Sequence, residues 1–309
     1  MKKPRILIAL VLMIGVLVSG CGMQNSQPKK TSVVCTSFAV FDWVTSIIKG
    51  FENKYEVTLL AGGGDIHSYQ PTAQDIAKIS KSDLFIYVGG VSDIWAEGLQ
   101  NKNSLKLAEV LEDDLLCVEE EQHNHSHKHG DFDEHIWLSL RLAQRSVDGI
   151  FGKLAEFAQG DELKAYMRNR DEYKERLEAL DLEYAETVEK SKDKTVVFAD
   201  RFPFLYMMKD YGITYFAAFP GCSADSDAGF GVIADLAAAV DANKKETVLV
   251  LEDSKLSVAE TVTGCTRSKD AKIAVMDSCQ SITREEIQKG VSYIEIMKAN
   301  LESLKMALQ

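Results

Sequence analysis

The segment that decides the fold lies in the middle of the chain, where residues 161–190 read DELKAYMRNRDEYKERLEALDLEYAETVEK. Its apolar residues recur at spacings of mostly three, four or seven, which is the pattern of one buried helix face. They are Leu163, Tyr166, Tyr173, Leu177, Leu180, Tyr184 and Val188. Asp161 follows Gly160 and suits the start of a helix. We predict one helix here, about 45 Å long at 1.5 Å per residue; two shorter helices with a bend are the alternative.

Short β-rich runs flank this helix on both sides and alternate with helix-like segments. In the first half of the chain they are 33–38, 56–60, 84–88 and 115–118. In the second half they are 195–199, 213–217, 247–251 and 273–276. Strands that alternate with helices favour parallel sheets in an α/β fold. Four strands in each half predict two similar lobes, and an apolar stripe over 284–308 predicts a C-terminal helix on the second lobe.

The first 20 residues differ from the rest of the chain. Three basic residues precede an apolar run over 6–18, which is too short to span a membrane comfortably. Such a start is typical of an export signal, and VSGC (18–21) resembles the cleavage box of bacterial lipoproteins. We expect residues 1–20 to be removed, Cys21 to carry the lipid and 21–32 to form a flexible tether. An ordinary secretory signal with a chance cysteine is the alternative.

Charge and cysteine content narrow the functional classes. The net charge of −12 argues against a nucleic-acid partner, because phosphate binding needs a basic face, and it suits a protein that attracts cations. No C-x-x-C occurs, so a zinc ribbon has no support. Spacing alone does not fix a disulfide pairing, although the last two cysteines lie close together in sequence. Besides Cys21 the cysteines are Cys35, Cys117, Cys222, Cys265 and Cys279.

Histidine is the most informative residue type. Five of the six histidines lie between positions 123 and 135, and the sixth is His67. Four of them alternate in HNHSHKH (123–129), inside an acidic loop over 119–131: His123, His125, His127 and His129. We interpret this tract as a flexible, auxiliary metal-capturing loop, with a solvated polar loop as the alternative.

His67 and His135 occupy equivalent places in the predicted fold. His67 lies in GGGDIHSYQPT (62–72) after the second predicted strand, and His135 lies in DEHIWLSL (133–140) after the fourth. Open α/β sheets bind ligands at the carboxyl ends of their strands. The three glycines allow the backbone to approach a site closely. We therefore predict that both histidines bind a metal ion.

Carboxylates of the second half are candidates to complete this site. The predicted strands there end in Asp200, Glu252 and Asp277. All three would lie at the same edge of the second sheet, facing a site between the lobes. The alternatives are helix capping for Asp200 and Asp277 and a surface ion pair for Glu252.

These motifs resemble those of the zinc and manganese solute-binding proteins of ABC importers, the cluster with a rigid helix between its lobes. The stretches that carry the resemblance are GGGDIHSYQPTAQDIAKISKSDLFIYVGG (62–90), FDEHIWLSL (132–140) and DYGITYFAAFPG (210–221). The resemblance extends over the mature chain. It implies two α/β lobes joined by one long helix, metal in the cleft between them, and His67 and His135 as ligands of the first lobe.

The resemblance transfers less cleanly to the second lobe. Counting back from Tyr206 places the third ligand on Arg201, which cannot bind a cation, whereas counting from the strand places it on Asp200, which we favour. Asp277 before Ser278 matches the fourth ligand, an Asp followed by Ser or Pro. Histidine and carboxylate ligands suit Zn²⁺ and also Mn²⁺. The histidine-rich loop is typical of the zinc members of the family and favours Zn²⁺.

We thus expect an N-terminal lobe over 33–140, linking helices over 141–192 and a C-terminal lobe over 193–309. The resemblance implies a monomeric, lipid-anchored protein on the extracytoplasmic face of the cell membrane, which captures Zn²⁺ and delivers it to an ABC permease and its ATPase. A manganese-specific member of the same family and a metal-binding surface adhesin or storage lipoprotein are the alternatives.

Two other functional classes find less support. A zinc hydrolase needs an open metal position and a general base, but neither His-Glu-x-x-His nor Gly-x-Ser-x-Gly occurs. We therefore expect a protein that is not an enzyme. A binding protein for an organic solute would carry aromatic and Arg clamps, for which Arg201 and Phe202 are the only hint.

Overall fold

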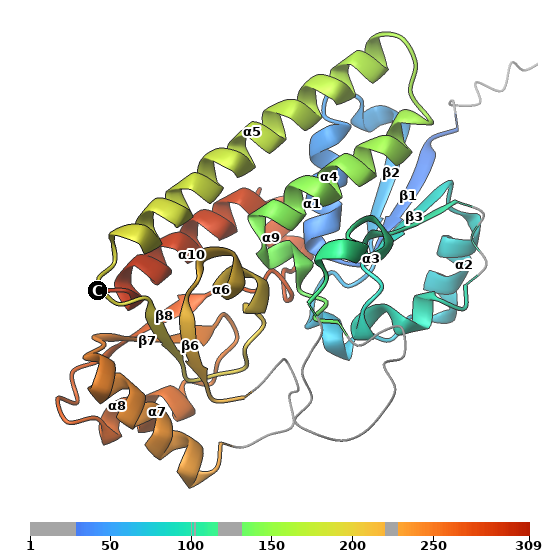
Figure 1. The fold of residues 1–309 in the computed structure, drawn as a ribbon. Coiled ribbons are helices and arrows are strands. Elements are labelled where there is room, and N and C mark those ends of the chain that lie inside the picture. The colour runs from blue at the N-terminus through green and yellow to red at the C-terminus, as the bar shows by residue number, and fades with distance from the viewer. Residues whose placement is uncertain (1–28, 100, 102, 117–131, 220–227) are drawn as a thin grey trace, which may run out of the picture.

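Two parallel sheets of four strands organise the chain (Figure 1). The computed structural model describes residues 29–99, 101, 103–116, 132–219 and 228–309. The first sheet has the order β2-β1-β3-β4, formed by β1 (Thr31–Cys35), β2 (Tyr55–Leu59), β3 (Leu84–Tyr87) and β4 (Ser104–Lys106). The second repeats that order as β6-β5-β7-β8, formed by β5 (Thr195–Phe198), β6 (Thr214–Ala217), β7 (Thr247–Leu251) and β8 (Lys272–Met276). The predicted α/β class with two four-stranded lobes is confirmed.

The fourth strand of the first sheet was predicted in the wrong place. It is β4, in which Leu105 is buried and pairs with Ile86 of β3. Of the predicted run 115–118 the structure describes Leu115 and Leu116, and neither lies in a strand. Leu115 and Leu116 instead pack their partly buried side chains against the core. The apolar run therefore reflects core packing and not sheet pairing. The first strand also begins earlier than predicted. β1 begins at Thr31, inside the segment 21–32 that was expected to be a tether.

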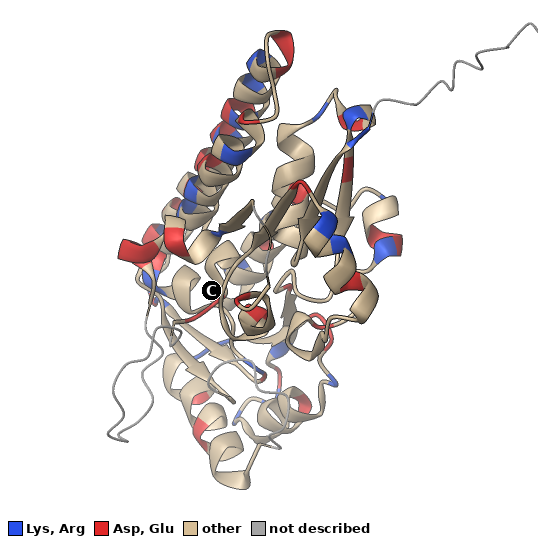
Figure 2. Cartoon of the chain, turned by 90° about the vertical axis from the view of Figure 1, so that its right-hand side faces the viewer, with Lys and Arg blue, Asp and Glu red and all other residues tan. Residues whose placement is uncertain are grey.

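The predicted long helix is α5 (Asp161–Lys190), which runs unbroken along both lobes (Figure 1). Its outer face mixes acidic and basic residues (Figure 2), whereas its apolar stripe is buried. Tyr173 donates a hydrogen bond to Asp42 in the first lobe at 2.7 Å, and Tyr184 donates to the carbonyl of Met297 in the second at 2.6 Å. One helix thereby fastens both lobes.

The other helices cover the sheets, and their buried side chains form one large hydrophobic cluster and two smaller ones. In the first lobe they are α1 (Phe38–Ile47), α2 (Ala73–Lys81), α3 (Leu107–Val110) and α4 (Leu140–Ala155). In the second they are α6 (Leu205–Tyr211), α7 (Phe230–Asn243), α8 (Ser257–Cys265), α9 (Arg284–Gln288) and α10 (Tyr293–Ala307). The largest cluster of buried side chains crosses from lobe to lobe, and Trp43 of α1 meets Tyr293 of α10 edge-to-face at 5.4 Å between ring centroids. The placement of the lobes thus rests on side-chain packing as well as on α5.

The C-terminal stripe forms two helices where the sequence predicted one. Gly290 adopts a φ of +89° between α9 and α10, a conformation that glycine reaches without a Cβ penalty. Ser292 then caps α10 by accepting the N–H of Glu295 at 3.3 Å. The apolar spacing persists across this break, because Ile287 of α9 packs against the same hydrophobic cluster that contains Ile294 of α10.

Several predictions lie outside the described residues: the export signal, lipidation at Cys21, the histidines of the 123–129 tract, and the thiols of Cys117 and Cys222. Within the described part of the chain Cys35, Cys265 and Cys279 are free thiols, so the last two do not pair. No helix in the described ranges combines the length and the apolar character needed to cross a membrane.

Candidate metal centre

His67 is presented by a short turn after β2. The turn is a 3-10 helix, Ile66–Ser68, and Asp65 caps it by accepting the backbone N–H of His67 on Oδ1 at 2.9 Å. Gly63 precedes it with a φ of +135°, which a side chain would strain. The side chain of His67 remains 21% exposed. The glycine-rich stretch thus turns the chain so that this imidazole reaches the space between the lobes.

His135 stands at the start of another 3-10 helix, Ile136–Leu138, and is buried. The carboxylate of Asp133 holds it twice through Oδ1, at 2.9 Å from the backbone nitrogen and 2.7 Å from Nδ1. Trp137 packs against the imidazole with 5.3 Å between ring centroids. The ring is therefore fixed, with Nδ1 turned to a carboxylate and Nε2 turned away from it.

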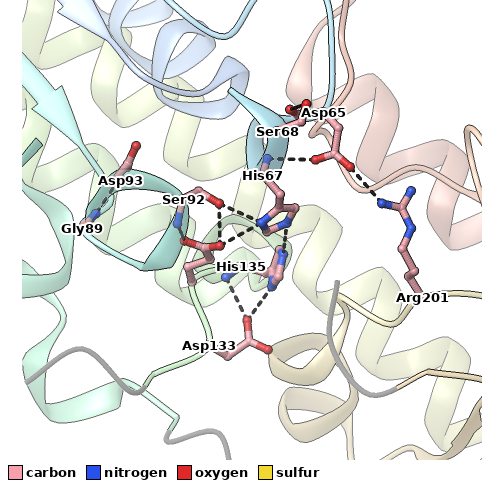
Figure 3. A network of polar contacts seen from close by, with 10 residues as sticks. Asp65, His67, Ser68, Gly89, Ser92, Asp93, Asp133, His135 and Arg201 are labelled. Carbon is pink, nitrogen blue, oxygen red and sulfur yellow. Dashed lines mark hydrogen bonds and ion pairs between the residues drawn. The ribbon is translucent and has the colours of Figure 1, made fainter. Parts of the chain in front are cut away.

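The two Nε2 atoms face each other at 3.2 Å (Figure 3). Two nitrogens bound at about 2.0–2.1 Å to one tetrahedral zinc ion lie roughly 3.3–3.4 Å apart. Carboxylates at Nδ1 favour the tautomer that carries its proton there, so each Nε2 directs a lone pair toward the same point. Such a pair of lone pairs repel each other unless a cation lies between them. The geometry of His67 and His135 fits a zinc ion.

Glu134 contacts His67 at Nδ1, on the opposite side of the ring from the Nε2 atom that faces His135. Its Oε1 lies 3.1 Å from His67 Nδ1 and accepts the Ser92 hydroxyl at 2.6 Å, while Oε2 accepts the Ser92 N–H at 2.7 Å. Burial raises the pKa of Glu134, but the hydrogen bonds from His67 and Ser92 outweigh it and leave the pKa below its ordinary value. Within the described residues His67, Glu134 and His135 form a group whose ligand atoms lie within 4.8 Å of one another.

Ser92 is held in place by a buried carboxylate beside it. It lies in a 3-10 helix, Val91–Ala96, where Asp93 accepts the N–H of Val88 at 2.8 Å and the hydroxyl of Thr36 at 3.1 Å. Burial raises the pKa of Asp93 to about 6. These bonds fix the turn after β3 and therefore Ser92, whose hydroxyl lies 2.7 Å from His67 Nδ1 as well as beside Glu134.

The second-lobe candidates are placed differently. Asp200 accepts the N–H of Arg201 on one oxygen at 2.8 Å and that of Leu251 on the other at 3.2 Å, which ties the end of β5 to β7. Asp277 accepts the N–H of Cys279 at 2.7 Å. Burial, and then the nearby charge of Glu252, raise the pKa of Asp277 to about 7. Among the described residues, neither aspartate belongs to the compact group around the two histidines.

Glu252 also remains in the second lobe, where it accepts the N–H of Ser278 at 2.9 Å and its hydroxyl at 2.6 Å. An ion pair joins the two lobes instead: Arg201 Nη1 lies 2.8 Å from Asp65 Oδ2 (Figure 3). Because the other oxygen of Asp65 caps His67, this pair connects the second lobe to a histidine of the first.

Sequence reasoning missed Glu134, Asp133 and Ser92. A signal for the first two was present, because both carboxylates directly precede His135 in DEH (133–135). Nothing in the sequence indicates that Glu134 supports His67 rather than its neighbour His135, because that contact depends on how the two loops meet.

The fold and the paired histidines agree with comparisons to known proteins. The model of the family described as zinc-uptake complex component A, periplasmic (ZnuA), matches residues 33–307. The chain belongs to this family. A curated member, the high-affinity zinc uptake system protein ZnuA of Bacillus subtilis, is 29% identical and is covered to 94%, as is this chain.

Other ZnuA relatives differ in length. The zinc-binding lipoprotein AdcA of Streptococcus pneumoniae is 31% identical over 99% of this chain, but the chain spans 61% of that protein. The crystal structure of the metal-dependent lipoprotein YcdH from Bacillus subtilis superposes with a TM-score of 0.74 at 27% identity, covering 91% of this chain and all of that one. The Zn(II)-bound ZnuA-like domain of Streptococcus pneumoniae AdcA gives a TM-score of 0.71 at 28% identity, covering 90% and 99%. The two-lobed ZnuA fold therefore extends over the described chain.

Proposed function

We propose that this chain is the extracytoplasmic zinc-binding subunit of an ABC importer, which captures Zn²⁺ and passes it to the membrane permease. The observation that carries the proposal is the pair of Nε2 atoms 3.2 Å apart, each backed by a carboxylate at Nδ1. The zinc-binding relatives, one of them matched over nearly its whole length, support the same ion and the same kind of transport system. The protein would bind and release the ion without breaking or forming covalent bonds, so we do not assign it an enzymatic reaction.

We propose His67 and His135 as zinc ligands through Nε2. Carboxylate oxygen would complete the shell, and Asp277 is a better second-lobe candidate than Asp200. Both oxygens of Asp200 accept backbone N–H groups, whereas Asp277 and Glu252 hold two carboxyl groups close together in a partly buried place that a cation would stabilise. Imidazole nitrogens favour Zn²⁺, while a shell richer in carboxylate oxygen would favour Mn²⁺.

The remaining features of the proposal follow from the sequence. Lipidation of Cys21 would hold a monomer on the outer face of the cytoplasmic membrane, within reach of the permease that works with the ATPase. The histidines at 123–129 would act as an auxiliary metal-capturing loop. Residues 33–140 and 193–309 would act as two lobes connected by the helices of 141–192.

Competitive titration of zinc and manganese tests the proposal. The protein in which Asn replaces all four histidines of the 123–129 tract should keep one tightly bound zinc ion. Adding His67→Ala or His135→Ala to that variant should abolish this binding. Manganese at equal concentration should not displace zinc. Tight binding that survives both alanine variants would exclude the cleft as the zinc site. For transport, cells that depend on this gene should grow in chelator with the wild-type protein and not with His67→Ala.

A further inference from the structure

A tyrosine of the second lobe fastens the segment that carries His135. Tyr206 of α6 is buried, and its hydroxyl donates to the carbonyl of Asp133 at 2.7 Å and accepts the N–H of Leu116 at 3.1 Å. The carbonyl of Leu116 in turn accepts the N–H of Asp133 at 2.8 Å. One hydroxyl thus joins two stretches of first-lobe chain to each other and to the second lobe.

Asp133 connects this joint to the metal centre. Its main chain is bonded by Tyr206 and Leu116, and its carboxylate holds both the backbone N–H and Nδ1 of His135. The position of its backbone therefore sets where the carboxylate stands and which way the imidazole turns. Trp137, two residues beyond His135, is also held from the second lobe, because its indole N–H donates to the carbonyl of Ser278 at 2.8 Å.

We propose that Tyr206 is a positioning residue for zinc capture, which acts on the ion through Asp133 and His135 without touching it. This inference rests on the proposed function. A ligand held in its bound orientation before the ion arrives does not lose conformational entropy on binding. Without the hydroxyl, the segment 132–135 would become ordered only when the ion binds. The entropy lost in ordering it would make the free energy of zinc binding less favourable.

The same helix offers a matched control. Tyr211 of α6 also donates a hydrogen bond of 2.7 Å, but to Asp181 of α5, away from the histidines. Tyr206→Phe and Tyr211→Phe therefore each remove one hydroxyl and one donated hydrogen bond from α6, and Tyr206→Phe also removes the bond accepted from Leu116. We expect Tyr206→Phe to raise the zinc dissociation constant about ten-fold, the lower end of the range for partners that orient a ligand. Tyr211→Phe should leave it unchanged even if both variants unfold at the same lowered temperature.

Two further readouts separate positioning from a general loss of stability. Co²⁺ in the site should show an altered visible absorption spectrum in Tyr206→Phe and the wild-type spectrum in Tyr211→Phe. In a double-mutant cycle, Tyr206→Phe should weaken zinc binding less when Asp133→Asn is already present, because both act on the same imidazole. Equal zinc affinities for the two tyrosine variants, or an additive cycle, would overturn the inference. Absence of zinc binding by the wild-type protein would instead overturn the proposed function.

Discussion

Replacing Glu134 with Gln removes one charge and leaves the shape of the side chain nearly unchanged. Both oxygens of Glu134 face donors: Oε1 faces the Ser92 hydroxyl and His67 Nδ1, and Oε2 faces the Ser92 N–H. Whichever way a glutamine amide is turned, its NH₂ group meets at least one of these donors. The variant therefore loses a charge-assisted hydrogen bond and leaves a buried donor unsatisfied. This loss lowers the stability of the folded site by about 1.5–3 kcal/mol.

The expected loss of zinc-binding free energy is of the same size as this loss of stability. Partners that hold the far nitrogen of a ligating imidazole typically contribute 10- to 100-fold to metal affinity, or about 1.4–2.7 kcal/mol. Glu134 also places a negative charge one imidazole away from the ion. We therefore expect Glu134→Gln to raise the zinc dissociation constant about 10- to 100-fold, with His67 still present.

The assay is competition with a chromophoric chelator, and the second lobe supplies the matched variant. Glu252 is bonded by the N–H and hydroxyl of Ser278 just as Glu134 is bonded by those of Ser92. Glu252→Gln disturbs an equivalent serine pair that does not contact a histidine directly. Because Glu252 lies beside the proposed ligand Asp277, we expect this variant to lose some zinc affinity, but less than Glu134→Gln loses. Unchanged affinity in Glu134→Gln would refute the reasoning, and an equal loss in Glu252→Gln would show that the second-lobe carboxylates matter as much for zinc binding as the support of His67 does.

Two further changes probe charge and packing in the metal-free protein. The folded pKa of Asp277 is raised to about 7, so its ionisation favours the unfolded state, and the stability present below pH 4 is lost as pH rises to 7. Asp277→Asn should accordingly raise the free energy of unfolding at pH 8 by up to about 4 kcal/mol, seen as a higher melting temperature. At pH 4 the variant should show no gain. A gain that is independent of pH would contradict this assignment. Tyr173→Phe leaves the buried Asp42 without its hydroxyl donor and should cost about 1–3 kcal/mol in urea unfolding. Zinc affinity should stay unchanged in that variant, and an altered affinity would show that α5 influences the site.

The sequence predicts those parts of the fold whose pattern is long and local. The helix α5 shows one apolar stripe through its whole length and was predicted with its observed bounds. The strand β4 is only three residues long with one buried side chain, Leu105, and such a pattern is too short to separate from a loop. The pair Leu115 and Leu116 resembles a strand because it is apolar, although its burial comes from packing.

The same distinction between local pattern and long-range contact holds for the site. His67 and His135 lie in motifs whose spacing is visible in the sequence, and the structure brings their Nε2 atoms together across 68 positions. The ion pair of Arg201 with Asp65 spans 136 positions and depends on how the lobes meet. Residue type alone could not separate a carboxylate that ties two strands, such as Asp200, from one that supports a ligand.

If both imidazoles bind the ion as proposed, their unequal exposure has a consequence for how quickly that ion can leave. The side chain of His67 is 21% exposed, whereas that of His135 is 6% exposed and held by its aspartate. Ligand exchange at a metal begins where an incoming group can reach it, so water or an acceptor protein would displace His67 first. The dissociation rate of the ion would then depend on the residues around His67, and His135 would dissociate from the ion last.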